Sequence, residues 1–180
     1  KDSKKITMDN KIAQELRDAY EEGSFLGFVY NEYYRGSKSE LILELCKAHE
    51  NKEINFFDEL LTLNRENECF FPYHQIIEEI TISLEHIDCR ELFLCSNHLY
   101  KEAGEDLASH YFMEPFMNNV HKDLAGLDAL IEDLALREDI SQLLIAGARS
   151  DVTKYFEKAK VLLREKSNYQ YKVIFALNRM

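Results

Sequence analysis

Residues 70–107 read FFPYHQIIEEITISLEHIDCRELFLCSNHLYKEAGEDL, and this stretch decides the fold. Pro72 suits the first turn of a helix, where its missing N–H costs nothing. The apolar residues that follow recur at steps of one, three and four and so share one helical face: Ile76, Ile77, Ile80, Leu84 and Ile87. Asp88 is placed to cap a second helix, with Glu91 completing a capping box and Gly104 ending it. Because such a hairpin cannot bury both its faces alone, it predicts further helical pairs stacked on either side.

Helical spacing of apolar residues continues before and after this hairpin, and only two prolines and six glycines interrupt it. The segments with this spacing are residues 9–23, 24–34, 37–49, 54–64, 72–87, 88–104, 107–112, 115–121, 124–139, 140–149, 151–166 and 169–180. Aromatic and β-branched residues would also allow strands at residues 24–34 and 169–180. We expect Leu134, Val152 and Phe156 on buried faces.

Helix starts are marked by further capping residues. Ser37 and Glu40 match a capping box, and Asp139 and then Ser150 or Asp151 are placed to cap the helices that follow them. Gly23 is expected to end the first helix.

The fold class predicted is all-α, built from stacked antiparallel helix hairpins with about nine to eleven helices. The arrangement resembles a HEAT-like or tetratricopeptide-like α-solenoid, with a compact multi-helix bundle as the alternative. The resemblance is architectural only, since the chain has no tetratricopeptide signature and no ankyrin TPLH-type motif. No linker divides the chain, so we expect a polar lead at residues 1–8 and one domain at residues 9–180.

The charge of the chain favours a basic protein as its partner. Its formal net charge is −11, from 33 acidic and 22 basic residues, which disfavours nucleic acid and anionic membranes. No run approaches the roughly 20 apolar residues that span a bilayer, and no export signal precedes the first helix. Four cysteines are too few for a disulfide framework, so we expect reduced thiols and a cytoplasmic protein.

Two cysteines have a histidine three residues further along the chain, at Cys46 with His49 and at Cys95 with His98. Residues three apart share a helical face, so one such pair from each of two helices would complete a Cys₂His₂ zinc site. The alternative, which we favour, is that these cysteines are small apolar core residues. We therefore expect no cofactor.

Motifs for nucleophilic catalysis or phosphate binding are absent. The chain has no GxSxG elbow, no GxxxxGK[ST] loop, no GxGxxG and no HExxH, and we expect no enzymatic activity. A metal-dependent helical enzyme is an alternative, with its candidate residues among His86, Cys89, His98, Asp106 and His110.

Acidic residues gather in loops beside aromatic ones, which is the composition of a surface that binds a basic protein. The predicted partner-binding residues are Glu66, Glu68, Phe70, Phe71, Tyr73, Glu102, Glu105, Asp106 and Tyr111. In a hairpin stack, loops at the same end line up along one edge, so these would merge into a negative groove. The alternative is that the aromatic residues belong to the core and the acidic residues form a solvated rim.

The function predicted from these features is that of a non-enzymatic protein-binding protein. A specific form of it is an immunity or inhibitor protein that neutralises a basic toxin such as a nuclease. The alternatives are a helical-repeat scaffold or adaptor that binds a peptide or a helix, and the metal-dependent enzyme. The sequence leaves the oligomeric state open.

Overall fold

The computed structural model describes residues 9–66, 72–104 and 109–180. Within these ranges every regular element is helical, which confirms the predicted all-α class. The α-helices are α1 (Asp9–Glu22), α2 (Phe25–Arg35), α3 (Lys38–Glu50), α4 (Phe56–Leu60), α5 (Tyr73–Ser83), α6 (Cys89–Ala103), α7 (Glu114–Asn119), α8 (Leu124–Glu132), α9 (Ile140–Ser150), α10 (Val152–Leu163) and α11 (Gln170–Arg179). Three short 3-10 helices lie between them: η1 (Ser109–Phe112), η2 (Val120–Lys122) and η3 (Leu134–Asp139).

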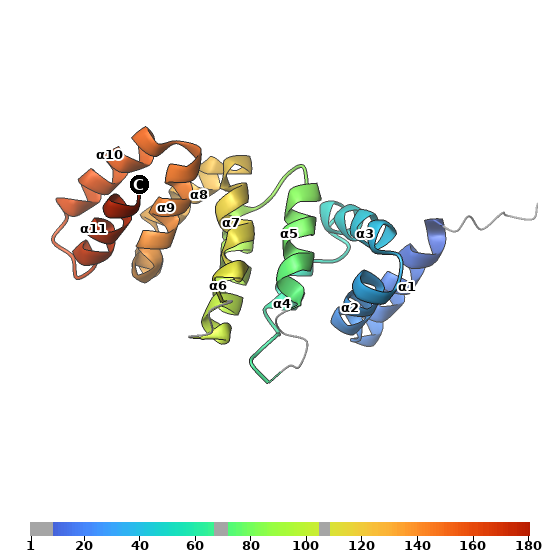
Figure 1. The fold of residues 1–180 in the computed structure, drawn as a ribbon. Coiled ribbons are helices and arrows are strands. Elements are labelled where there is room, and N and C mark those ends of the chain that lie inside the picture. Colours follow the sequence, from blue (N-terminus) through green and yellow to red (C-terminus); the bar gives the residue numbers. More distant parts are fainter. Residues whose placement is uncertain (1–8, 67–71, 105–108) are drawn as a thin grey trace, which may run out of the picture.

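Most helices pack in two rows, in which a helix lies against the one two positions along the chain. One row consists of α1, α3, α5, α7, α9 and α11, and the other of α4, α6 and α8. Helix α2 packs against α1 and α3, and α10 packs against α9 and α11. Figure 1 shows the result as a line of helices that runs from α1 and α2 at one end to α10 and α11 at the other. This is the stacking of helical hairpins that the sequence predicts.

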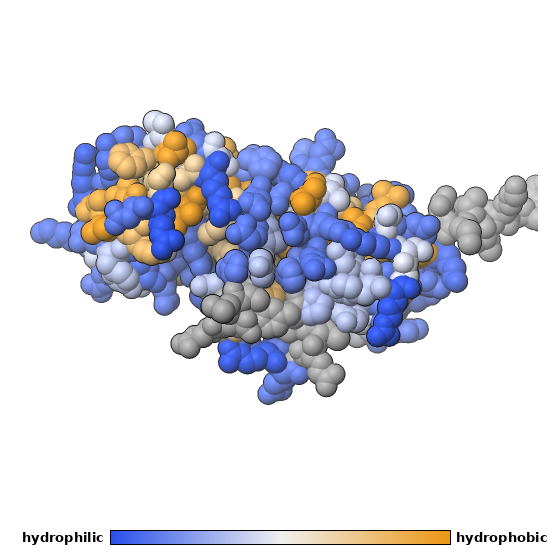
Figure 2. Space-filling view, in the orientation of Figure 1, coloured by the Kyte–Doolittle hydropathy of each residue, from blue (hydrophilic) through white to orange (hydrophobic). Residues whose placement is uncertain are grey.

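Hydrophilic residues cover most of the face drawn in Figure 2, and hydrophobic side chains gather on it over the end formed by α10 and α11. Among the helices that the structure describes, none combines the length and the apolar character needed to cross a membrane.

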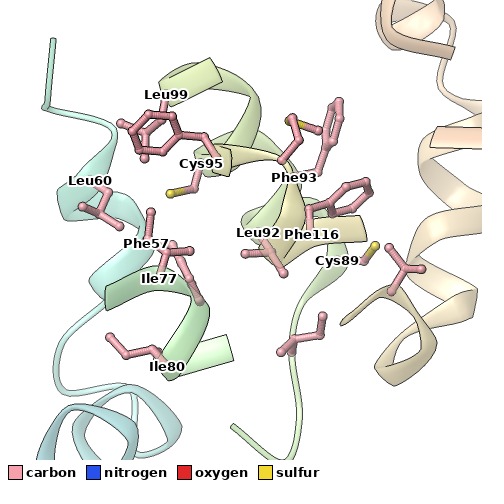
Figure 3. Close-up of a cluster of buried hydrophobic side chains, with 14 of the residues drawn as sticks. Phe57, Leu60, Ile77, Ile80, Cys89, Leu92, Phe93, Cys95, Leu99 and Phe116 are labelled. Carbon is pink, nitrogen blue, oxygen red and sulfur yellow. The ribbon is translucent and has the colours of Figure 1, made fainter. Parts of the chain in front are cut away.

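Helix α6 lies at the centre of the core. Its side chains meet those of α4 and α5 on one side and those of α7 on the other, as Figure 3 shows. The fully buried residues of this cluster include Phe57, Leu60, Ile77, Ile80, Leu92, Phe93, Leu99 and Phe116. Burying a side chain of this size stabilises the fold by about 1.5–3 kcal/mol relative to leaving it exposed. The apolar stripe predicted for residues 76–87 therefore faces the interior.

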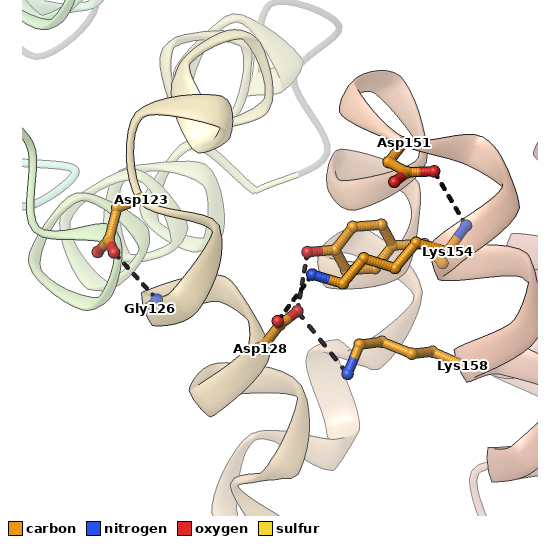
Figure 4. Close-up of polar contacts among 7 residues, drawn as sticks. Asp123, Gly126, Asp128, Asp151, Lys154 and Lys158 are labelled. Atoms are coloured by element: carbon orange, nitrogen blue, oxygen red, sulfur yellow. Dashed lines mark hydrogen bonds and ion pairs between the residues drawn. The ribbon is translucent and has the colours of Figure 1, made fainter.

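Asp123 connects two helices through one carboxylate. Its Oδ1 accepts a hydrogen bond from Gly126 N at 3.0 Å and so caps α8 (Figure 4). Its Oδ2 accepts one from Cys89 N at 2.9 Å, which satisfies a free N–H group in the first turn of α6. The start of α6 and the start of α8 are therefore fixed relative to each other.

Lys122 binds free backbone groups at the C-terminal end of α5, as Asp123 does at the starts of α6 and α8. Its Nζ donates to the carbonyl oxygens of Thr81 at 2.6 Å, Leu84 at 2.7 Å and Ile82 at 3.2 Å, where α5 ends. A cation at this position satisfies free carbonyls and interacts favourably with the helix dipole. Burial lowers the pKa of Lys122, since it disfavours the charged ammonium.

The last two hairpins are joined by Asp128, which lies on α8. Its Oδ1 accepts a hydrogen bond from the Tyr155 hydroxyl at 2.8 Å, and its Oδ2 accepts one from Lys154 Nζ at 2.9 Å (Figure 4). Burial pushes the pKa of Asp128 upward, but these two hydrogen bonds and the nearby Lys158 outweigh it, so the pKa is lowered. Gly147 on α9 lies directly against the buried Tyr155 ring.

Three predicted helices are shorter than their apolar patterns suggest. The helix expected at residues 72–87 ends at Ser83, because Leu84 takes an extended conformation with ψ of 126°. The helix expected at residues 54–64 is confined to α4, whose start is capped by Asn55. The helix expected at residues 124–139 stops at Glu132, and η3 replaces its second half. The break is at Asp133, where the carboxylate accepts hydrogen bonds from Ala135 N at 3.0 Å and from Arg90 Nη2 at 2.6 Å.

Three residues expected on buried faces lie at the surface. Leu134 is 76 % exposed, because the break at Asp133 turns it away from the core. Val152 and Phe156 are 49 % and 40 % exposed, since in the described chain no helix packs on the outer side of α10.

Helix ends agree with the predictions in part. Gly23 and Gly104 have positive φ, of 78° and 67°, and follow the ends of α1 and α6. Asp88 and Asp151 cap α6 and α10 through their side chains. The side-chain caps predicted for Ser37 and Asp139 are wrong, because neither side chain accepts a capping hydrogen bond.

The double role of Asp123 predicts a large effect of its removal. Asp123→Ala should lower the free energy of unfolding by about 2–3 kcal/mol, because it leaves N–H groups of two helices without an acceptor. Asp151→Ala removes a cap from α10 alone and should cost about 1 kcal/mol. Urea denaturation of both variants measures the difference, and equal losses would contradict the double role.

Two glycines in helices should respond to alanine with opposite signs. A Cβ at Gly147 would overlap the Tyr155 ring, so Gly147→Ala should destabilise the protein by about 1–3 kcal/mol. A Cβ at Gly27 on α2 would meet nothing within 4 Å, so Gly27→Ala should stabilise it by about 0.5–1 kcal/mol. Thermal unfolding of both variants tests this, and a shift of the same sign in both would be inconsistent with the packing described.

Candidate functional site

A cleft of about 610 Å³ opens where two successive hairpins turn at the same end of the stack. One wall is the end of α3 with the turn into α4, and the other is the turn from α5 into α6. The residues lining the cleft are His49, Glu50, Lys52, Ile54, Asn55, Glu85, His86, Ile87, Asp88 and Glu91.

Local sequence shapes both walls. Lys52 takes a left-handed conformation with φ of 59°, which allows the chain to leave α3 and reach the cap at Asn55. In the second wall, Leu84 and Ile87 are buried and anchor the turn, and Asp88 caps α6 by accepting a hydrogen bond from Glu91 N at 3.1 Å. The apolar anchors hold both turns against the core, so the polar residues beside them line the cleft.

Glu91 joins the two walls. Its Oε1 accepts a hydrogen bond from Asn55 Nδ2, and its Oε2 lies 3.6 Å from His49 Nε2. The side chain is 22 % exposed. The predicted capping box is therefore formed only by Asp88, because the Glu91 carboxylate points across the cleft to the preceding hairpin instead of to its own helix start.

His49 is held in place by neighbours on two sides. Its ring packs edge-on against Phe57 with 5.2 Å between ring centroids, and the side chain is 13 % exposed. The carboxylate of Glu91 favours the tautomer that carries a proton on Nε2, which leaves Nδ1 as an acceptor. This Nδ1 is buried and has no hydrogen-bond partner within the described residues.

The lining combines negative charge with a small apolar surface. Glu50, Glu85, Asp88 and Glu91 contribute four carboxylates, against one ammonium from Lys52. Ile54 and Ile87, which are 3 % and 8 % exposed, supply small apolar edges of the lining. Lysine and arginine bury their aliphatic stems on apolar surface while their charged ends remain at polar groups. The cleft is therefore suited to a basic side chain of a partner protein.

The predicted partner-binding residues lie at the other end of the stack or outside the described residues. Glu66 is exposed, and Tyr111 is 48 % exposed and stacks on His74. Glu102 Oε2 accepts a hydrogen bond from Arg65 N at 3.2 Å, which ties the loop after α4 to α6. Tyr73 is in the core, where its hydroxyl donates to Leu26 O at 2.6 Å. Glu68, Phe70, Phe71, Glu105 and Asp106 lie outside the described residues.

The two cysteine–histidine pairs, Cys46 with His49 and Cys95 with His98, lie in different environments. Cys46 and Cys95 are buried, His49 lines the cleft, and His98 Nε2 lies 2.6 Å from Leu63 O. In residues 9–66, 72–104 and 109–180, no group of three or more His, Cys, Asp or Glu side chains could hold a metal ion.

Burial makes the described thiols weak acids. It raises the pKa of Cys46 from 9.0 to about 11 and that of Cys89 to about 12, and the pKa of the fully buried Cys95 is raised further. The thiolate is the nucleophilic form of cysteine, so these three residues have the properties of inert core thiols.

Sequence patterns alone do not bring the residues of the cleft together. They give no role to Glu85 or Asn55, and they place Glu91 only in a capping box. The order of the helices could have identified these residues, because in stacked hairpins the turns at residues 51–55 and 84–88 must lie at the same end. Lining up the turns by end, instead of searching for dense acidic runs, would have placed these residues together.

A scan against protein-family models, a search of curated proteins and a search of solved structures each gave no match for this chain. The function proposed below therefore rests on the geometry of the described residues.

The raised thiol pKa values predict a loss of stability at high pH. Between pH 9 and 11 the unfolded chain releases the Cys46 proton while the folded protein retains it, so the free energy of unfolding should fall as pH rises. One thiol contributes at most about 1.4 kcal/mol per pH unit. Denaturation over this range should give a shallower decline for Cys46→Ala than for the unmodified chain. Parallel declines would show that Cys46 ionises equally in both states.

Proposed function

We propose that this chain is a protein-binding protein that uses the cleft to receive a basic segment of its partner. The proposal rests on the residues that line the cleft, which are four carboxylates and one lysine, together with Ile54 and Ile87. A lysine or arginine of the partner would place its stem on the isoleucines and its charged end among the carboxylates. The formal charge of −11 would speed the encounter with such a partner and make it sensitive to salt.

The specific form of the proposal is an inhibitor that neutralises a cationic toxin, such as a nuclease. The nucleic-acid site of a nuclease is rich in lysine and arginine, because it must hold phosphates. A carboxylate-lined surface of a small helical protein can occupy such a site in place of nucleic acid. The polar lining favours this function over an adaptor that holds an apolar helix, since helix-in-groove binding needs a hydrophobic groove.

Charge reversal within the cleft tests the proposal directly. Glu50 and Glu85 line the cleft, and both are exposed. Glu50→Lys combined with Glu85→Lys should weaken binding of a short fluorescent oligoarginine peptide by about tenfold or more, because two attractions become repulsions. Fluorescence anisotropy at low salt measures this affinity, and binding to the unmodified chain should fall steeply as salt is added.

Two single variants give the comparison, each matched in charge to Glu85→Lys alone. Glu157→Lys on α10 makes that charge change away from the cleft and should reduce affinity less than threefold. Glu66→Lys tests the opposite end of the stack, where the sequence predicts the partner surface. If Glu66→Lys weakens binding more than Glu85→Lys does, the site lies at that other end. Equal effects of these three single variants would mean that the peptide senses net charge alone.

The natural partner can then be sought with the same variants. Pull-down from the source cell at low and high salt should capture a basic protein that the unmodified chain holds and the Glu50→Lys, Glu85→Lys variant releases. Capture that is equal for both chains would remove the cleft from the interaction.

A further inference from the structure

The outer side of the last hairpin is an apolar surface without a cover in the described structure. Its members are Val152 and Phe156 on α10 and Tyr171, Ile174 and Phe175 on α11, each between 40 % and 65 % exposed. Figure 2 shows hydrophobic side chains gathered at the α10 and α11 end of the molecule. We call these five residues the C-terminal face. Exposed apolar side chains that gather on one hairpin mark an interaction site more often than scattered ones do.

The position of this face in the stack explains why it is open. Every earlier hairpin is covered by the helices that follow it, as α9 is covered by α10 and α11. In the described chain no element packs on the far side of α10 and α11. The face therefore has the composition of an inter-hairpin contact, and no hairpin of the described chain occupies it.

The charge around the C-terminal face is opposite to that of the whole chain. Residues 152–180 contain seven lysines and arginines but only two glutamates, within a chain whose formal charge is −11. Two of the lysines, Lys154 and Lys158, pair with Asp128 on α8, which leaves five cations for the surface of this hairpin. Several of the cations lie over the exposed rings. Lys160 Nζ is 5.4 Å from the centre of the Phe156 ring, and Arg179 Cζ is 4.7 Å from that of Phe175. The face is thus both apolar and cationic.

The opposite end of the stack has the complementary character. A groove of about 620 Å³ between α1 and α2 is lined by Glu15, Asp18, Glu22 and Glu32, with Phe28 as its aromatic member and no lysine or arginine. Gly27 lies on this groove, and the space above it is open. In the first hairpin such a glycine allows another helix to approach closely.

We propose that the C-terminal face of one molecule docks on the α1–α2 groove of a second copy, so that the hairpin stack continues from molecule to molecule. Cations around the face would meet the carboxylates of the groove, and the exposed rings would be covered by helix α2 of the neighbour. An anionic membrane is the less suitable occupant, because the net charge of −11 repels such a surface. A head-to-tail contact of this kind is heterologous and produces open chains of molecules.

Sedimentation of the full 180-residue chain over a range of concentrations tests this proposal. The average mass should rise with concentration beyond that of a dimer, and high salt should reduce it. Gly27→Arg blocks the groove with a cation at a position that has room for a side chain, and Tyr171→Glu with Ile174→Glu blocks the face. Each variant alone should be monomeric at concentrations at least tenfold above those at which the unmodified chain associates.

Mixing the two variants gives the decisive result. The face of the Gly27→Arg molecule and the groove of the Tyr171→Glu, Ile174→Glu molecule are both intact, so an equimolar mixture should form a heterodimer and nothing larger. Ile82→Glu changes an exposed isoleucine in the middle of the stack and should leave association unchanged. Circular dichroism confirms that every variant is folded.

Three results would overturn the proposal. An unmodified chain that stays monomeric at all concentrations has no self-association through these surfaces. A Gly27→Arg variant that dimerises as well as the unmodified chain would mean that two C-terminal faces meet each other. A monomer that co-sediments with phosphatidylserine vesicles, and loses this binding in the Tyr171→Glu, Ile174→Glu variant, would assign the face to a membrane instead.

Discussion

Most helices of this chain pack against the helix two positions along the sequence, in addition to their sequence neighbours, and this packing constraint determines how the hairpins stack. Helix α6 illustrates it, because its buried side chains need α4 on one side and α8 on the other. Polar contacts that fix the spacing of the hairpins follow the same connections: Asp123 joins the starts of α6 and α8, and Lys122 closes the end of α5. The repeated stacking brings every second turn to the same end, and in the described chain it leaves the two outermost hairpins each with one uncovered side.

The cleft forms because the stacking places two turns at the same end of the molecule. A single turn of this chain offers too few polar groups to hold a ligand, but two adjacent turns place the carboxylates of Glu50, Glu85 and Glu91 around one space. Glu91 makes this arrangement rigid, since its carboxylate is held by Asn55 and lies close to His49 of the preceding hairpin. A negative site that is fixed before its ligand arrives loses less conformational entropy on binding than a mobile one. The proposed capture of a basic partner depends on this preorganisation.

The sequence predicts the class of fold, but it does not bring the residues of the cleft together. Apolar spacing is a local signal, so the helices around Ile76 and Leu92 and the caps at Asp88 and Asp151 could be read from neighbouring residues. The break at Asp133 could not, because it depends on Arg90, which lies 43 residues earlier in the sequence. The cleft was missed for the same reason: Glu91 matches a capping box locally, and only the packing of the α3 hairpin against the α5–α6 turn shows where its carboxylate goes. Exposure of Phe156 is likewise a property of the end of the stack and not of its own helix.

If the cleft receives the basic partner, binding must be local and not a response to acidity in general. Nuclear magnetic resonance of the ¹⁵N-labelled chain, titrated with the oligoarginine peptide, distinguishes the two because every backbone amide reports its own surroundings. We expect the largest chemical-shift changes at residues 49–55 and 85–91, and we expect them to saturate together. Changes that are largest at residues 64–66 and 102–111, or that are spread evenly over all acidic residues, would contradict binding in the cleft.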